Sequence, residues 1–345
     1  MTFGDPPELS PDAAAPHPPE LSPDPAAPHP LDPIAVVRPD LSPDPAAEPD
    51  QLQVTVDTGD RIAFLDWGGP TRPEAIAGPS LPPLLLVHGL SRTAWSWTPI
   101  ARRLRTVTRV IAPDLRGHGA SESPREGYDL ESLAFDMLTV LTACGVGSAV
   151  VAGHGFGALV AATMATLRPE TVVGLALLDA GWERAEDETG MDAPELLRSL
   201  QEPPEVLASM EAYLADRRDW DPATWDADEE RAARSAVDEK HQGRVVPVVR
   251  RWALAGCVEA MFSYRPASAL ARYPGATLIA IAEPGGADDE EARERRVALD
   301  EQLTARTRAG LPAARVVRFA GVGHDLMRYR PDALAQQLFE LLRAG

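Results

Sequence analysis

A short segment in the middle of the chain has the local pattern of a turn that presents a catalytic nucleophile. Residues 149–158 read Ala-Val-Val-Ala-Gly-His-Gly-Phe-Gly-Ala, so a strand-forming run leads through three alternating glycines into a helix-forming stretch. This context supports a match to the Gly-x-Ser-x-Gly motif, whose central residue sits on a strained turn with no room beside it. The central residue here is Gly155, which has no side chain to attack a carbonyl group. Any chemistry at this turn would need a different nucleophile.

Alternating strand and helix patterns surround the turn and predict a doubly wound, mostly parallel sheet of the α/β class. The first two strands are joined by Thr58-Gly59-Asp60, a hairpin signal, and later strands are short apolar runs typical of a buried parallel sheet. The predicted strands are residues 52–57, 61–67, 84–87, 109–112, 150–152, 172–178, 278–282 and 316–319. The predicted helices are residues 95–104, 130–144, 156–167, 289–308 and 331–343.

The first 50 residues differ in composition from the rest of the chain. They contain 15 of the 34 prolines and repeat an approximate motif at Leu9–Ala14, Leu21–Ala27 and Leu41–Ala47. Such a segment cannot bury enough apolar surface to offset the entropy lost on ordering. We therefore expect residues 1–50 to form a disordered, partly polyproline-like tail, either a solubilising extension or a docking linker.

A second change of pattern lies between two predicted strands. Residues 182–265 are rich in Glu, Asp, Arg and Trp, follow helical patterns and contain no convincing strand. Their position predicts a helical cap inserted into the sheet domain, which would then comprise residues 51–181 and 266–345.

Composition excludes several classes of partner. The formal net charge is −19, so the chain lacks the cationic surface that drives binding to nucleic acid. No apolar run approaches the roughly 18 residues of a membrane span, and the N-terminus lacks the pattern of a signal peptide. We therefore expect a cytoplasmic protein that binds a small molecule and neither nucleic acid nor a membrane. The sequence makes no prediction of the oligomeric state.

Metals and cofactors are also not expected. The two cysteines, Cys144 and Cys257, lie in apolar surroundings without metal-ligand spacing, and we expect buried, inert thiols. The histidines are scattered without ligand spacing. The glycines of residues 153–157 do not have the spacing of a dinucleotide-binding motif.

Four blocks of sequence, in order along the chain, resemble segments of the α/β-hydrolase fold superfamily. They are Leu-Val-His-Gly-Leu at 86–90, Ala-Pro-Asp-Leu-Arg-Gly-His-Gly-Ala-Ser at 112–121, the glycine turn at 153–157, and Gly-Val-Gly-His at 321–324 before a helix opened by Pro331. The resemblance covers residues 51–345. It implies an eight-stranded, mostly parallel sheet with an inserted cap.

The resemblance also implies a set of catalytic groups. In this family a histidine activates the nucleophile, an acid orients the histidine, and two backbone amides stabilise the oxyanion. By position, the histidine is His324, the amides are those of Leu90 and Phe156, and the nucleophile position is occupied by Gly155. The amides belong to the backbone, so the loss of the serine does not remove them.

The acid that would pair with His324 is ambiguous. The family commonly places it in a turn after the seventh strand, where the matching residue here is Gly285. Asp288 or Asp289 would reach the histidine if that loop is longer, although either could instead cap the next helix, and Glu283 is a further alternative. Asp179, which follows the sixth predicted strand, is the other main candidate because some branches of the family supply the acid there.

Other polar residues in these blocks are expected to be structural. We expect the side chain of His154 to point away from the pocket and pack under the sheet. His118 and Asp114 are interpreted as structural residues, the aspartate tying its loop together through hydrogen bonds to the backbone. Arg116 is interpreted as structural too, with the alternative that an arginine near the pocket holds a carboxylate. His88 is expected to organise the loop that carries the oxyanion amide.

The substrate side of the pocket is less well specified. Gly89, Ser91 and Trp182 are expected to contact the substrate, and several tryptophans in the core and cap favour an apolar or aromatic ligand, although each is individually typical of packing. Ser91 is also a weak candidate for a displaced nucleophile.

Three functional hypotheses remain open. In the first, a small, largely apolar ester or carbonyl compound is processed by an esterase- or lyase-like reaction in which His324 acts on water or on the substrate itself. In the second, the chain binds or senses a small ligand without catalysis. In the third, it is an ordinary serine hydrolase whose nucleophile has been changed to Gly155.

Overall fold

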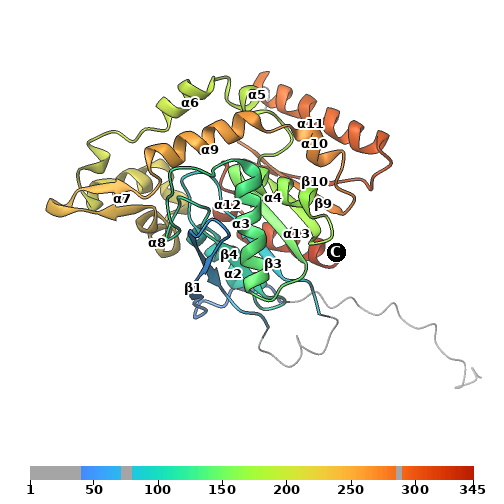
Figure 1. Ribbon diagram of the computed structural model, residues 1–345, viewed down its shortest axis with the longest axis horizontal. Coiled ribbons are helices and arrows are strands. Elements are labelled where there is room, and N and C mark those ends of the chain that lie inside the picture. The colour runs from blue at the N-terminus through green and yellow to red at the C-terminus, as the bar shows by residue number, and fades with distance from the viewer. Residues whose placement is uncertain (1–39, 71–79, 285–289) are drawn as a thin grey trace, which may run out of the picture. The chain divides into compact units, whose positions relative to one another are not determined.

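The computed structural model of the chain describes residues 40–70, 80–284 and 290–345 (Figure 1). Eight strands form one sheet in the order β1-β2-β4-β3-β5-β6-β9-β10. The strands are β1 (Asp50–Thr55), β2 (Arg61–Asp66), β3 (Leu84–Val87), β4 (Val110–Pro113), β5 (Ala149–His154), β6 (Val172–Leu178), β9 (Ala276–Glu283) and β10 (Arg315–Ala320). β1 pairs with β2, and β2 with β4, in antiparallel fashion, whereas every other pair is parallel. The predicted eight-stranded, mostly parallel sheet is confirmed.

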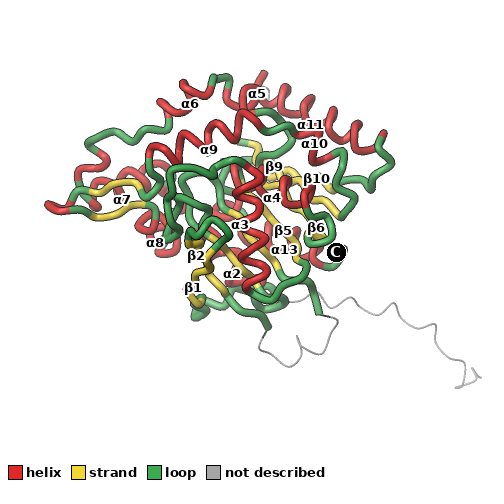
Figure 2. The backbone as a smooth tube through the Cα atoms, viewed as in Figure 1, coloured by secondary structure: helices red, strands yellow, loops and turns green. Residues whose placement is uncertain are grey.

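Helices cover both faces of this sheet (Figure 2). The main core helices are α2 (Thr98–Leu104), α3 (Leu130–Ala143), α4 (Phe156–Leu167), α11 (Glu290–Arg308) and α13 (Pro331–Leu342). Along β3, Leu85 and Val87 belong to the apolar cluster that includes α3 and α4, whereas Leu84 and Leu86 belong to the cluster that includes α2 and α13. Side chains alternate between the two faces of a strand, so each strand supplies apolar groups to both layers.

α4 lies very close to the sheet because its first turns are made of small residues. Gly157, Ala158, Ala161 and Ala162 are all buried on it. A β-carbon at Gly157 would collide with the carbonyl oxygen of Val87 on β3. This close approach fixes the start of α4 against the carboxyl ends of the central strands, where ligands bind in folds of this type.

The segment between β6 and β9, which we call the cap, is mostly helical. Its helices are α5 (Ala185–Thr189), α6 (Ala193–Ser199), α7 (Met210–Trp220), α8 (Ala227–Ser235), α9 (Arg251–Ser263) and α10 (Pro266–Leu270). In Figure 1, α5, α6 and α9 lie along the top of the view, above the sheet. Short 3-10 helices occur at Ala94–Trp97, Val206–Ala208, Pro222–Thr224 and His241–Gly243.

The expectation that the cap contains no strand is wrong. β7 (Val237–Glu239) and β8 (Val245–Pro247) form an antiparallel hairpin within it. Its connection includes Gln242 and Gly243, both with positive φ. Strands of three residues are too short for an alternating pattern to be recognised in the sequence.

Part of the predicted tail is packed on the sheet domain. Residues 1–39 lie outside the described residues. Beyond them, Ala47 is buried and Leu41 packs against the apolar cluster of α2 and α13. β1 begins at Asp50, so the packed chain extends further towards the N-terminus than the predicted boundary at residue 51.

None of the helices among the described residues combines the length and apolarity needed to cross a bilayer. No group of three or more His, Cys, Asp or Glu side chains among those residues is placed to hold a metal ion.

Candidate active site

Gly155 occupies the turn between β5 and α4 with φ 53° and ψ −123°. This is a conformation that glycine tolerates and that strains any other residue. A β-carbon added there would lie 3.0 Å from Nε2 of His324 and 3.7 Å from the Cα of Gly89. A side chain at position 155 would therefore point at the imidazole ring.

The neighbouring glycines are required for a different reason. A β-carbon at Gly153 would collide with the backbone of Gly157, just as one at Gly157 would collide with β3. Both obstacles are backbone atoms that cannot move aside. At Gly155, by contrast, the nearest obstacle is a side chain, the ring of His324, which would have to shift by a few tenths of an ångström.

His324 is paired with Asp179. Nδ1 of the histidine, in the tautomer that carries a proton there, donates to Oδ2 of the aspartate at 2.7 Å. Oδ1 accepts from the amide of Ala282 at 3.0 Å and from Nη2 of Arg295 at 3.3 Å. The Asp179 side chain is only 4% exposed, whereas that of His324 is 51% exposed. The pairing leaves Nε2 of His324 facing the space above Gly155.

The other candidate acids are not brought to the histidine. Asp288 and Asp289 lie outside the described residues. Glu283 forms an ion pair with Arg318 at 3.1 Å. Of the predicted acids, the structure brings Asp179 alone, among the described residues, into hydrogen-bond contact with the ring.

The electrostatic environment favours the protonated form of His324. Partial burial lowers the pKa of the imidazole, but the hydrogen bond and charge of Asp179 raise it, as do the carboxylates of Asp325 and Glu188. The net effect is a pKa above the ordinary value for histidine. The paired aspartate thus stabilises the imidazolium that forms when the ring accepts a proton.

His324 opens into a cavity of about 600 Å³, called the main cavity below. Leu90 and Phe156 both border it, and neither backbone amide donates to another of the described residues. Gly89 and Ser91 also line the main cavity, and Ser91 has φ 60°. The cap contributes a mostly apolar wall, with Leu200, Tyr213, Trp220, Ala232, Ala233, Ala236 and Met261.

One carboxyl group in the main cavity was not singled out by the sequence. Glu188, on α5 of the cap, lines the cavity, and its carboxyl group has no hydrogen-bond partner among the described residues. Burial raises its pKa to about 7, with Glu183 and Asp179 adding to the shift and the charges of His324 and Arg295 opposing it. A large fraction of this side chain is therefore a neutral acid near neutral pH.

Four of the other charged residues that border the main cavity form what we call the cavity ion cluster: Arg92, Glu229, Asp325 and Arg328. Arg92 binds Glu229 at 2.9 Å and also Asp325, while Arg328 lies 3.1 Å from Glu229. Glu229 and Arg328 are only 7% and 8% exposed. The cluster joins the loop after β3, cap helix α8 and α12 (Leu326–Tyr329), so it fixes the cap to the sheet domain beside the cavity.

His154 differs from its prediction. Its ring does not pack away from the pocket but lies against His324, with ring centroids 4.3 Å apart, and borders the main cavity. Nε2 of His154 donates to the backbone oxygen of His324 at 3.0 Å. Burial, together with the charge of His324, lowers the pKa of His154 to about 4, so the ring is neutral and positions the histidine loop.

The structural interpretations of the neighbouring polar residues are confirmed. Asp114 accepts from the amides of Ala94 at 2.7 Å and Ala120 at 2.9 Å. Nδ1 of His88 lies 2.8 Å from the oxygen of Gly89, and its Nε2 accepts from the amide of Leu115 at 2.9 Å. In the same region, Arg116 forms a bidentate pair with Asp136, and Nδ1 of His118 lies 3.1 Å from the oxygen of Arg116.

Trp182, expected to contact the substrate, does not border the main cavity. It is 1% exposed and belongs to the core cluster of α3 and α4, with the guanidinium of Arg295 over its ring at 5.3 Å. Cys257 is buried and Cys144 is partly exposed; both are free thiols.

Some of the cavity residues that the sequence analysis did not select lie close to a recognised motif, and others do not. Asp325 directly follows the histidine block and Arg92 lies two positions after Leu90, so proximity to a motif could have identified both. Glu188 and Glu229 lie in a cap segment with many acids, where nothing local distinguishes them.

Comparison with known proteins identifies the fold and its relatives. Residues 84–337 match the Alpha/beta hydrolase family. The chain is 35% identical over 133 residues to Uncharacterized protein Rv2715 of Mycobacterium tuberculosis, which covers 39% of this chain and 36% of that protein. It is 34% identical over 100 residues to Epoxide hydrolase 4 of Mus musculus (28% of each chain), and 36% identical over 97 residues to the Soluble epoxide hydrolase of Corynebacterium sp., covering 28% of this chain and 34% of the relative. The matched stretches span about a third of the length of these relatives.

Solved structures agree on the fold. The crystal structure of E-2-(acetamidomethylene)succinate hydrolase superimposes with a TM-score of 0.67 at 22% identity, covering 86% of this chain and 100% of that one. An enol-lactonase from Burkholderia xenovorans LB400 gives a TM-score of 0.61 at 19% identity, covering 85% and 100%. At these identities the likeness concerns the fold.

Proposed function

The chain belongs to the α/β-hydrolase family, and on that premise we propose that it hydrolyses a small, largely apolar ester or related carbonyl compound without a side-chain nucleophile. Water takes the place of the missing serine, and His324 acts as its general base. The observation that carries this proposal is the direction of position 155, where an added β-carbon would lie 3.0 Å from Nε2 of His324. A water molecule above Gly155 would be within hydrogen-bond reach of that nitrogen.

The reaction needs no group beyond those around the main cavity. The water oxygen forms a bond to the carbonyl carbon while Nε2 of His324 takes its proton. The amides of Leu90 and Phe156 stabilise the oxyanion, and the carboxylate of Asp179 stabilises the imidazolium. When the bond to the leaving group breaks, the imidazolium returns the proton to the departing oxygen, so the acid and the alcohol are released and the histidine is neutral again.

The lining of the main cavity supports the substrate class. Its volume is in the range of small-molecule sites, and the cap wall is mostly apolar. Charged groups in the wall are largely neutralised within the cavity ion cluster. A neutral, largely apolar substrate fits this lining without leaving its own charges unpaired.

An epoxide is a second candidate substrate. Two of the relatives are named epoxide hydrolases, and Glu188 offers a neutral carboxyl group in the same cavity. Water activated by His324 would attack an epoxide carbon, the ring C–O bond would break, and the released oxygen would take the proton of Glu188. Proton transfer between the histidine and the glutamate, through solvent, would then restore both groups.

The test compares four forms of the chain on p-nitrophenyl acetate and butyrate, with styrene oxide as the epoxide. They are the unmodified chain and the variants Gly155→Ser, Gly155→Ala and His324→Ala. We expect His324→Ala to lower the turnover of the unmodified chain about 10²–10⁴-fold. Gly155→Ala is the matched control, because its methyl group fills the space above the turn without adding a nucleophile, and it should also lower turnover.

The outcomes separate the hypotheses. If only Gly155→Ser is active and its activity depends on His324, the chain is a serine hydrolase silenced at one position. If no form is active, a non-catalytic ligand-binding protein is favoured. Turnover by the unmodified chain that survives both His324→Ala and Gly155→Ala contradicts the proposal.

A further inference from the structure

Within the segment before β1, residues 41–47 contact the sheet domain through three residues. Leu41 packs against the apolar cluster of α2 and α13, and Ala47 is buried in it. Between them, Asp44 forms an ion pair with Nη1 of Arg105 at 2.6 Å, and its amide donates to the carbonyl of Arg102 at 3.0 Å. Nε of Arg102 donates to the carbonyl of Ala47 at 3.2 Å. We call this surface of α2 the docking site.

The three contacting residues have a fixed spacing. They are the first, fourth and seventh residues of the sequence Leu-Ser-Pro-Asp-Pro-Ala-Ala at 41–47. The four residues between them, Ser42, Pro43, Pro45 and Ala46, are exposed. Recognition thus depends on a Leu-x-x-Asp-x-x-Ala pattern, held by one ion pair, two apolar contacts and hydrogen bonds to the backbone.

The same pattern occurs twice more in the chain. Residues 21–27 repeat the seven residues of 41–47 without a change, and residues 9–15 differ from them at one exposed position, where Ala13 replaces a proline. Both copies lie outside the described residues. Every side chain that the docking site contacts is present in each of them, in the same order and spacing.

We propose that the docking site is a binding site for this motif, and that residues 21–27 are a second ligand for it, in competition with the resident copy at 41–47. The backbone hydrogen bonds do not depend on side chains, and Arg105 is matched by Asp24 as it is by Asp44. An acidic motif on an arginine surface is also complementary in charge.

Chain connectivity favours the resident copy. Its last residue, Ala47, is three positions before the first residue of β1, whereas Ala27 is 23 positions before it. Closing the longer loop lowers the occupancy of the distant copy by about twentyfold for otherwise equal contacts. The resident copy is therefore the form expected at rest, and the other copies gain access when it is released.

The copies differ in one contact that reaches the cap. Glu48, the residue after the resident copy, binds Arg102 on α2 at 3.1 Å and Arg231 on cap helix α8 at 2.6 Å. Proline occupies the corresponding position after each of the other copies, at Pro28 and Pro16. An exchange of copies would keep the docking contacts but remove this link between the sheet domain and the cap.

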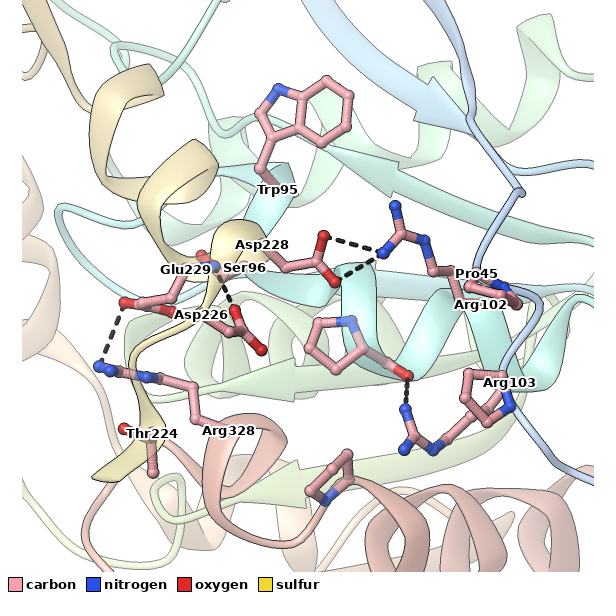
Figure 3. A pocket seen from close by; sticks show the side chains of 13 residues that line it. Pro45, Trp95, Ser96, Arg102, Arg103, Thr224, Asp226, Asp228, Glu229 and Arg328 are labelled. Atoms are coloured by element: carbon pink, nitrogen blue, oxygen red, sulfur yellow. Dashed lines mark hydrogen bonds and ion pairs between the residues drawn. The ribbon is translucent and has the colours of Figure 1, made fainter. Parts of the chain in front are cut away.

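A second cavity lies between the docking site and the main cavity. This second cavity, of about 220 Å³, is bordered by the resident segment, including Pro45, and by Arg102, Asp228 and Glu229 (Figure 3). Glu229 and Arg328 border this cavity and the main cavity alike. The segment bound on α2 and two members of the cavity ion cluster thus border the same second cavity.

The proposal can be tested with a peptide of residues 19–29 and saturation-transfer NMR, which detects weak ligands. The protein partners are the unmodified chain, a variant with only the resident copy disabled, and a variant with all three copies disabled. The disabling changes are Leu→Ser and Asp→Ala at Leu9, Asp12, Leu21, Asp24, Leu41 and Asp44. A peptide of residues 39–49 is the positive control, and a 19–29 peptide with Asp24→Ala is the negative control.

We expect saturation transfer from the protein to the 19–29 peptide to be strongest for the variant with all three copies disabled and weaker for the variant with only the resident copy disabled. Transfer from the unmodified chain should be at least severalfold weaker. The methyl groups of Leu21 and Ala27 should receive at least twice the saturation of Ala26, and Arg105→Ala in the fully disabled chain should abolish the transfer. A thermal melt of each variant shows that it is folded. Absence of transfer to the fully disabled chain, equal saturation of Ala26 and Ala27, or indifference to Asp24→Ala would each overturn the proposal.

Discussion

Two groups of charged residues lie in or directly behind the wall of the main cavity, and they are built in opposite ways. In the pair of His324 and Asp179, the carboxylate is fixed by its neighbours while one nitrogen of the ring stays open towards Gly155. In the cavity ion cluster, both carboxylates bind arginine side chains, and the cluster spans the sheet domain and the cap. The pair keeps a reactive atom free, whereas the cluster uses its charges to hold two parts of the chain together.

This difference implies that activity and stability depend on separate sets of residues in the same cavity. Changes in the pair should affect mainly turnover and its pH dependence. Changes in the cluster should affect mainly the free energy of unfolding. Variants that affect both equally would show that the two sets are not separate.

The largest effect is expected for Asp179→Asn. The amide would favour the wrong tautomer of His324 and would no longer stabilise the imidazolium, so turnover should fall about 10²–10⁴-fold. Because Asp179 raises the pKa of His324, the variant should have a lower histidine pKa. Activity requires the neutral ring, so the acid limb of the pH–rate profile should move to lower pH in the variant. An unmoved acid limb would show that the histidine is not the titrating base.

The next effect is expected for Glu229→Gln, measured by urea denaturation. The change leaves two largely buried arginine side chains with one carboxylate instead of two, which should lower the free energy of unfolding by about 3 kcal/mol. Glu230→Gln is the matched control on the same helix, because its pair with Arg234 is exposed and should contribute less than about 0.5 kcal/mol. Equal effects of the two variants would remove the distinction between cluster and surface.

A smaller effect, and one that depends on pH, is expected for Glu188→Gln. The folded chain raises the pKa of Glu188 from 4.5 to about 7, so the ionised form is disfavoured in the folded state. The glutamate therefore costs nothing below about pH 4.5 and destabilises the fold increasingly up to about pH 7. The variant should match the unmodified chain at pH 4 and be more stable by about 2 kcal/mol at pH 8. A difference in stability that is constant with pH would contradict this environment for the carboxyl group.

The smallest effect is expected for Glu48→Gln. Its carboxylate is 53% exposed, so the loss of its pairs with the two arginines should cost less than about 1 kcal/mol and should be screened by salt. The measurement is the urea midpoint at low and at high ionic strength. A larger, salt-independent loss would place this bridge with the cavity ion cluster rather than with surface pairs.

The sequence predicted the pair better than the cluster for a physical reason. Glycines that avoid collisions, such as Gly153 and Gly157, produce a local sequence pattern that can be recognised. His324 lies in a second such pattern, the Gly-Val-Gly-His block at 321–324. The acid stayed ambiguous because the choice of Asp179 depends on its positive φ of 52° and on the distance between two strand ends. Neither quantity is encoded by local residue types.

The cluster could not be predicted because its partners are distant in the chain. Arg92 and Glu229 are separated by 137 positions, and the cap places them together. The short hairpin of β7 and β8 was not predicted because three-residue strands show no periodicity. The packing of residues 41–47 on the sheet domain was not predicted because residues 21–27 have the same sequence, so local composition does not distinguish the two copies.

The geometry around Gly155 has a consequence for mutation at the level of the gene. Glycine codons that end in a pyrimidine lie one base change from codons for serine, cysteine and aspartate. The collisions with backbone atoms at Gly153 and Gly157 eliminate all such replacements there, whereas the nearest atom to a β-carbon at position 155 belongs to the side chain of His324. If the codon of Gly155 ends in a pyrimidine, a single base change would therefore place serine, cysteine or aspartate at this turn, at the cost of the backbone strain that its positive φ imposes.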